Sequence, residues 1–185
     1  LQENAQTYVN ISYQLGVMYF YYYENAEDTQ NATKWLKIAS GNETSVADEK
    51  EVNTILGEKK AFRAKHLYNI VQYYQGLDVT NKEGDTQGSY KQLWEDLTAI
   101  ITSNIAAEDN QVTALVMYNF MANQIAIHAE NFKEAGVTRE DMESVLKMLT
   151  DSSGYDENEE YEKELYIKLQ GNEEQAQKSI AVAYE

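Results

Sequence analysis

The chain contains two imidazole side chains, His66 and His128, and no cysteine. An imidazole could ligate zinc or act as a general base, but both tasks need further groups that converge on it. His128 falls on the apolar stripe of a predicted helix, and Glu130, two residues on, falls on another face. His66 lies among basic residues, which suit neither task. We therefore predict no catalytic residue, no metal site and no cofactor, and we interpret His128 as a core residue.

Acidic side chains gather near the C-terminal end, at Glu157, Glu159, Glu160, Glu162 and Glu164. The stretch over 151–162 has an acid at each end of a twelve-residue window, as a calcium-binding loop does. Its glycine stands at the fourth place of the window rather than the sixth, and a tyrosine fills a ligand place. We interpret these acids as the solvated start of a helix, where negative charge is favourable.

One concentration of basic residues interrupts this acidic chain, over 59–66. It has two interpretations. The cluster could dock an acidic peptide or a phosphorylated segment. Alternatively, its members could pair within the molecule, with Glu58 or with acids of neighbouring helices.

Five consecutive aromatic residues occupy 19–23, and they cannot all face one core. Tyrosine offers a large contact area with a polar tip, which suits peptide recognition. Packing against a long loop before Ala32 is the alternative. If a groove forms, we expect its lining to include Tyr21, Tyr22, Lys59, Arg63 and Tyr73.

Size and charge limit the classes of function. The 185 residues favour one domain, and the absence of proline with only 9 glycines favours helices over strands. A formal net charge of -16 argues against nucleic-acid partners and anionic lipid. No apolar run approaches the roughly 20 residues of a membrane span, and no signal peptide is evident. A first residue other than methionine indicates a fragment of a longer protein.

Apolar residues at helical spacing predict helices throughout. We expect them over about 4–23, 29–40, 48–77, 89–103, 110–135, 138–150 and 159–184, with Gly57 interrupting the third and Gly171 a possible division of the last. Thr138 and Asp141 have the spacing of a capping box. Gly16 is unfavourable inside a helix unless a neighbouring helix passes close to it.

The segment SYQLGVMY over 12–19 is similar to the first-helix motif of tetratricopeptide repeats, with Ser12 in place of tryptophan. The segment ATKWLKIA over 32–39 resembles the second-helix motif, with Leu36 in place of phenylalanine. Leu15, Leu67 and Met117 recur about 50 residues apart, longer than the usual period. We predict an all-α, tetratricopeptide-like stack forming one domain over 1–185. Its hairpins span about 4–40, 48–103 and 110–150, and a capping helix covers 159–184.

Three segments resemble the region that follows the kinase domain in bacterial serine/threonine kinases of the Firmicutes: LGVMYFYYY over 15–23, GEKKAF over 57–62 and FKEAGVTREDM over 132–142. The resemblance implies a regulatory or scaffolding region of a membrane-linked kinase. It does not imply kinase activity here, because the Gly-rich loop, H-R-D and D-F-G are all absent.

The leading hypothesis is a non-catalytic domain that captures a peptide or protein segment and thereby positions an attached kinase domain. The alternative is a freestanding, secreted or surface-anchored helical protein that binds a peptide or a glycan. We expect Trp35 and Trp94 to be buried under the first hypothesis, whereas a glycan binder would display at least one. A helical hydrolase is the third hypothesis, but no pair of carboxylates is distinguished by its spacing.

Overall fold

The computed structural model of the chain describes residues 2–22, 25–73, 86–103 and 111–185. Every regular element in these ranges is an α-helix, so the predicted all-α fold is confirmed. The chain divides into two compact units, Leu1–Asp78 (unit 1) and Val79–Glu185 (unit 2). The helices of the predicted hairpin over 48–103 fall in both units. The tetratricopeptide-like stack stays a prediction, and so does the assignment of residues 1–185 to a single domain.

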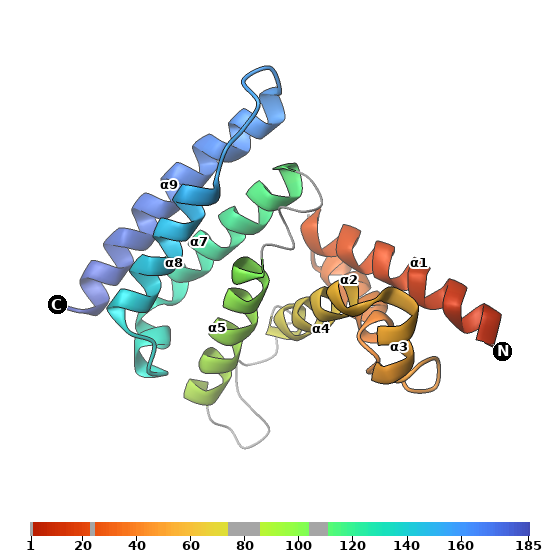
Figure 1. Ribbon diagram of the computed structural model, residues 1–185. Helices are drawn as coiled ribbons and strands as arrows, with labels where there is room; N and C mark the ends of the chain where they lie inside the picture. Colours follow the sequence, from red (N-terminus) through yellow and green to blue (C-terminus); the bar gives the residue numbers. More distant parts are fainter. Residues whose placement is uncertain (1, 23–24, 74–85, 104–110) are drawn as a thin grey trace. The chain divides into compact units, whose positions relative to one another are not determined.

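Unit 1 contains α1 (Gln2–Tyr21), α2 (Ala26–Ala39), α3 (Glu49–Leu56) and α4 (Glu58–Tyr73) (Figure 1). Asn25 caps α2 by accepting hydrogen bonds from the backbone N–H groups of Glu27 and Asp28. Asp48 and Glu51 form a reciprocal capping box at the start of α3. Gly57, with φ of 81°, separates α3 from α4, which confirms the predicted interruption.

The helices α1 and α2 form a hairpin whose close approach depends on Gly16. A Cβ atom at Gly16 would lie 2.8 Å from Leu36 Cγ and 3.1 Å from the backbone nitrogen of Leu36. The expectation that a neighbouring helix passes close to this glycine is therefore confirmed. Ala32, Leu36 and Ala39 are fully buried on the facing side of α2.

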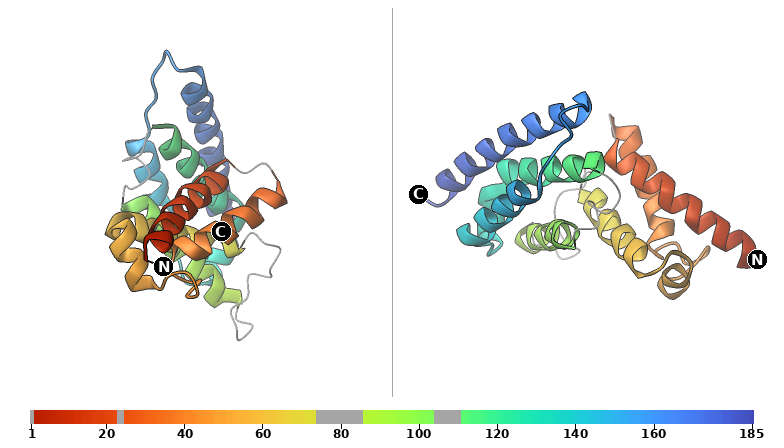
Figure 2. Two further views of the ribbon diagram at one scale, coloured as in Figure 1. Left: turned by 90° about the vertical axis from the view of Figure 1, so that its right-hand side faces the viewer. Right: turned by 45° about the horizontal axis from the view of Figure 1, so that its top comes forward.

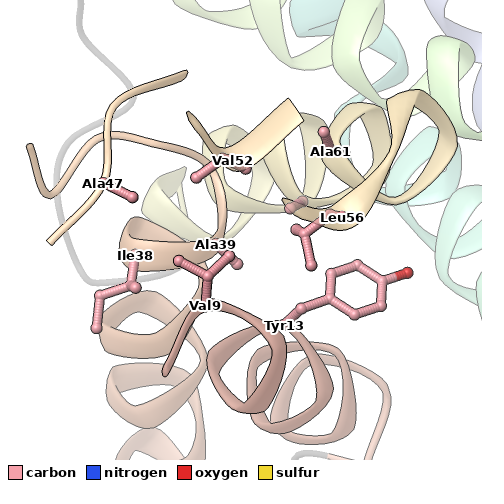
Figure 3. Close-up of a cluster of buried hydrophobic side chains, with 9 residues drawn as sticks. Val9, Tyr13, Ile38, Ala39, Ala47, Val52, Leu56 and Ala61 are labelled. Carbon is pink, nitrogen blue, oxygen red and sulfur yellow. The ribbon is translucent and has the colours of Figure 1, made fainter. Parts of the chain in front are cut away.

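The core of unit 1 joins all four of its helices. Figure 3 shows Val9 and Tyr13 of α1 converging with side chains of α2, α3 and α4. The remaining members are Ile38, Ala39, Ala47, Val52, Leu56, Ala61 and Ala64. Many of them are small, so the helix backbones can approach one another closely.

Unit 2 contains α5 (Thr86–Thr102), α7 (Gln111–Glu134), α8 (Arg139–Ser152) and α9 (Glu160–Ala183). Gly136, with φ of 91°, ends the turn after α7. Thr138 and Asp141 then form the capping box that the sequence predicts for α8. The last predicted helix is continuous through Gly171, so the chain does not divide there.

The helices α7 and α9 lie side by side along unit 2 (Figures 1 and 2). They run in the same direction, since residues further along α7 contact residues further along α9. Asn172 Nδ2 donates to Asn119 Oδ1 at 2.8 Å, and seven residues further on Ser179 Oγ donates to the Ala126 carbonyl at 2.8 Å. Seven residues make nearly two helical turns, so these polar pairs mark a seam of the coiled-coil kind. Between them lie Ala122 and Ala176, both fully buried.

The opposite side of α7 packs against α5 through aromatic rings. The Phe132 ring lies 5.2 Å from the Trp94 ring and 6.1 Å from the Tyr90 ring, measured between centroids. Met117, Met121 and Phe132 of α7 are fully buried. Ile127, by contrast, has 60% of its surface exposed.

Candidate interaction surface

The structure places the five predicted groove residues in different environments. Tyr21 and Arg63 are buried, with 6% and 3% of their surfaces exposed. Tyr22 and Lys59 are exposed, and Tyr73 is half-buried. Arg63 Nη1 donates to the Tyr13 hydroxyl at 3.1 Å, so its guanidinium links α4 to α1 inside unit 1. Of the five, Tyr22 and Lys59 are the most open to a partner.

The basic concentration over 59–66 makes several contacts within unit 1. Lys65 pairs with Glu49 of α3 at 3.4 Å, and the His66 ring lies 4.3 Å from the Phe62 ring. Lys60 Nζ stands 5.7 Å from the centre of the Tyr13 ring, which is within reach of a cation–π contact. These contacts favour the intramolecular interpretation of the cluster. An exposed pair such as Lys65–Glu49 is worth at most about 1 kcal/mol.

The most distinctive surface of unit 1 is a stripe along α1. We call it the α1 outer face, formed by Tyr8, Ile11, Leu15, Met18 and Tyr22. Their spacing of 3, 4, 3 and 4 residues aligns them along one side of a helix. Tyr8, Ile11, Met18 and Tyr22 are between 42% and 52% exposed, and Leu15 is half-buried.

Contacts of α1 within unit 1 define where this stripe lies and how far it extends. On the inner side of α1, Val9, Tyr13 and Phe20 are buried, so the helix has apolar residues on both sides. The Tyr22 backbone N–H donates to the Met18 carbonyl at 3.0 Å, which extends the helical path one residue past α1. The Tyr8 ring meets the Trp35 ring edge-on at 6.1 Å between centroids, so the stripe continues onto α2.

The α1 outer face is also uncharged. No Asp, Glu, Lys or Arg occurs from Asn4 to Tyr23 in the sequence. The exposed sides of α8 and α9 differ, because they carry ion pairs such as Arg139–Glu143 at 2.7 Å and Lys178–Glu174 at 2.7 Å. An exposed helix that presents large apolar side chains without charges is characteristic of a contact surface.

A small cleft lies between α3 and α4, with a volume of about 200 Å³. Val52, Ala61 and Phe62 contribute apolar surface, and Glu49, Glu58 and Lys65 contribute charges of both signs. Lys65 and Glu49 already neutralise each other across it. The cleft is large enough for one side chain of a partner.

His128 is half-buried in an aromatic environment, which is less burial than a core residue would have. Its ring lies 5.1 Å from the Tyr90 ring and 6.0 Å from the Phe132 ring. Burial lowers the pKa of His128 below its ordinary value, and a hydrogen bond with Asn131 opposes that shift. Among the described residues, no three histidine, aspartate or glutamate side chains gather as a metal site requires.

The acidic segment before α9 uses its carboxylates to order its own turn. Asp156 Oδ1 accepts from the backbone N–H of Asn158 at 2.9 Å, and Glu162 accepts from the backbone N–H of Asp156 at 2.9 Å. Such bonds match the interpretation of this segment as a helix start.

Trp35 and Trp94 are half-buried, which is less than the burial expected of them.

None of the helices described here is both long enough and apolar enough to cross a membrane. Comparisons with known proteins give no matching family model, no similar curated protein and no similar solved structure.

Proposed function

We propose that this chain is a non-catalytic protein-interaction domain, a regulatory part of a bacterial serine/threonine kinase signalling protein. The observation that carries the proposal is the α1 outer face, which exposes four large apolar side chains on a part of α1 that carries no charge from Asn4 onward. Fully burying a side chain of this size contributes about 1.5–3 kcal/mol, so covering the stripe would supply useful binding energy.

The spacing of the stripe indicates the shape of the partner segment. Anchors at intervals of 3 and 4 residues on one helix fit a second helix that lies along it. An extended segment would instead be matched by pockets for alternate side chains. We therefore propose that the captured segment is helical and that its capture positions or restrains an attached catalytic domain.

The tetratricopeptide-like interpretation belongs to the same proposal. It is supported by the first hairpin, where the motif's small residue Gly16 lies against Leu36 and its two alanines, Ala32 and Ala39, are fully buried. Hairpins of this kind hold partners and stack on one another. The resemblance to the kinase-associated region makes the attached kinase domain the first partner to try.

The parent gene provides the first test. We expect the sequence upstream of the Leu1 codon to encode a kinase domain with its Gly-rich loop, H-R-D and D-F-G elements. A signal peptide encoded directly upstream would contradict this and favour the alternative, a secreted or surface-anchored protein that binds a peptide or a glycan.

Binding provides the second test. The upstream kinase domain would be titrated by calorimetry into this chain and into Met18→Lys, which places a charge within the α1 outer face. We expect heat of binding with the unmodified chain and its loss with Met18→Lys. Ile127→Lys is the control, because Ile127 is an exposed apolar residue of unit 2, with 60% of its surface open to solvent against 44% for Met18. Equal binding by all three proteins would remove the α1 outer face from the proposal.

A further inference from the structure

The α1 outer face has nearly the same character in both directions. From either end its side chains are a tyrosine, an aliphatic residue, Leu15, an aliphatic residue and a tyrosine. Tyr8 and Tyr22 each stand seven residues from Leu15, and Ile11 and Met18 stand four and three residues from it. A surface with this symmetry is complementary to itself when one copy is turned by 180° about an axis through Leu15.

Two-fold pairing of identical subunits has that geometry, since each contact between two positions occurs twice. With the two α1 helices antiparallel, Tyr8 would meet Tyr22 of the second copy and Ile11 would meet Met18 of the second copy. Leu15 would meet Leu15 of the second copy on the axis. The tyrosine pairs would close both ends of the contact with offset or edge-on ring packing.

The charge pattern is compatible with a second copy of this chain as the partner. The chain carries a formal net charge of -16, so two copies repel each other at most approaches. The helix α1 is the exception, because residues 4–23 hold no charged side chain. A charged partner surface would lose hydration there and find no opposite charge. The stripe of a second copy carries no charged group whose hydration would be lost.

We propose that the α1 outer face binds the α1 outer face of a second copy of this chain, as an antiparallel two-fold dimer centred on Leu15. This inference rests on the proposal that the α1 outer face is a contact surface, and it adds a second copy of the chain as a partner for that face. In the parent protein such pairing would bring two signalling chains together, and any change in their local concentration would shift the balance between monomer and dimer.

The size of the contact limits its strength. From Tyr8 to Tyr22 the stripe covers 14 helical steps, or about 21 Å. One stripe of this length buries less than the roughly 800 Å² per partner of a standard stable interface. The dimer is therefore weak and concentration-dependent, and added salt strengthens it by screening the repulsion between acidic subunits.

Sedimentation equilibrium of the full chain is the primary experiment, from about 10 µM to about 1 mM, a range suited to small interfaces. We expect the average mass to rise from monomer towards dimer as concentration increases, and to rise earlier at higher salt. Met18→Lys should weaken the dimer at least about tenfold, because two buried ammonium groups would face the stripe. Ile127→Lys should associate like the unmodified chain. Circular dichroism of both variants establishes that each remains folded.

Disulfide formation tests the antiparallel arrangement. The sequence contains no native cysteine, so every crosslink must come from an introduced one. Ile11→Cys and Met18→Cys proteins would be oxidised separately and as a mixture. We expect crosslinks mainly in the mixture, because like positions stand about 9–12 Å apart along the antiparallel pair, beyond disulfide reach. Efficient crosslinking of each protein with itself would indicate parallel helices and overturn the proposed arrangement.

A chain that stays monomeric over the whole concentration range would also overturn this inference. The titration with the kinase domain is performed independently, so it decides the proposed interaction function in either case.

Discussion

The two units of this chain present different surfaces to solvent. Unit 1 holds 7 basic and 10 acidic residues, and unit 2 holds 8 and 21, so their formal net charges are -3 and -13. The exposed sides of α8 and α9 are rich in charges, whereas α1 exposes apolar residues along a helix without charges from residue 4 onward. The acidity of the chain is therefore concentrated in one unit, and the surface suited to contact lies in the other.

The units also differ in how their main helix pair is held. In unit 1, α1 approaches α2 through a glycine that leaves no room for a side chain. In unit 2, α7 and α9 pack through alanines and are fixed in register by partly buried polar pairs. The α1–α2 pair depends on the missing side chain of Gly16, whereas the α7–α9 pair depends on particular hydrogen bonds. The two pairs should therefore respond differently to substitution.

The largest expected effect separates the stabilities of the units. Phe132→Ala should lower the free energy of unfolding of unit 2 by about 3–5 kcal/mol, because it empties a fully buried ring position. Hydrogen exchange measured by mass spectrometry should show faster exchange in α7 and α9 while peptides of α1 and α2 keep their protection. Leu36→Ala is the reciprocal variant and should affect unit 1. Loss of protection in both units from either change would show that they unfold together.

The second prediction concerns the buried amide between α7 and α9. Asn119 Nδ2 donates to the Leu115 and Leu165 carbonyls, each at 2.9 Å, and its Oδ1 accepts from Asn172. Asn119→Ala should cost about 1–3 kcal/mol, since it leaves buried groups without partners. Urea denaturation monitored by circular dichroism would measure the change. The control is Asn123→Ala, which alters an exposed residue of the same helix and should have little effect. Equal urea midpoints for the two variants would contradict the view that Asn119 fixes the register of α9 along α7.

The third prediction uses one glycine from each unit. Gly16→Ala should destabilise unit 1 by about 1–2 kcal/mol, because the new methyl group meets Leu36 and this outweighs the helix preference for alanine. Gly171→Ala lies in α9 with nothing within 4 Å and should stabilise unit 2 by about 0.5–1 kcal/mol. Thermal unfolding of the two variants should therefore shift in opposite directions. A shift of both in the same direction would mean that the space around Gly16 relaxes easily.

The smallest expected effect is a pH dependence in unit 2. Burial keeps the pKa of His128 in the folded chain below its ordinary value of 6.5. Below about pH 6.5 the unfolded chain therefore binds more protons than the folded chain, so the free energy of unfolding decreases as the pH falls. The decrease ends once the pH passes below the folded-state pKa. Denaturation curves between pH 7 and pH 5 should show this slope in the unmodified chain and a flatter profile in His128→Gln. Identical profiles would assign the dependence to other groups.

Local signals made most helix positions predictable. The first helix was expected over 4–23 and lies at Gln2–Tyr21, and the fifth was expected over 110–135 and lies at Gln111–Glu134. The interruption at Gly57 and the capping box of Thr138 were also predicted, because each depends on residues within one turn of the chain. The end of the third predicted helix, over 74–77, lies outside the described residues.

The candidate surface was predicted less well. Arg63 was expected to line a groove, yet it is buried against Tyr13, 50 residues earlier in the chain. Tyr21 and Tyr22 are neighbours in the sequence, but one is buried and the other is 52% exposed. The repeated 3 and 4 spacing over Tyr8–Tyr22 was available as a signal of a helix face. It could not show whether that face is covered, because α1 is apolar on both sides.

The sequence by itself determined the all-α class, the boundaries of several helices, the close packing at Gly16 and the strongly acidic character of the chain. These properties follow from composition, from periodicity and from interactions within one or two helical turns. Only the tertiary structure decided that α9 lies parallel to α7, that Arg63 enters the core and that the other helices of unit 1 leave the outer side of α1 uncovered. Each of these depends on which distant surfaces meet, and the free energy of burial, being non-directional, does not specify that in the sequence of any single helix.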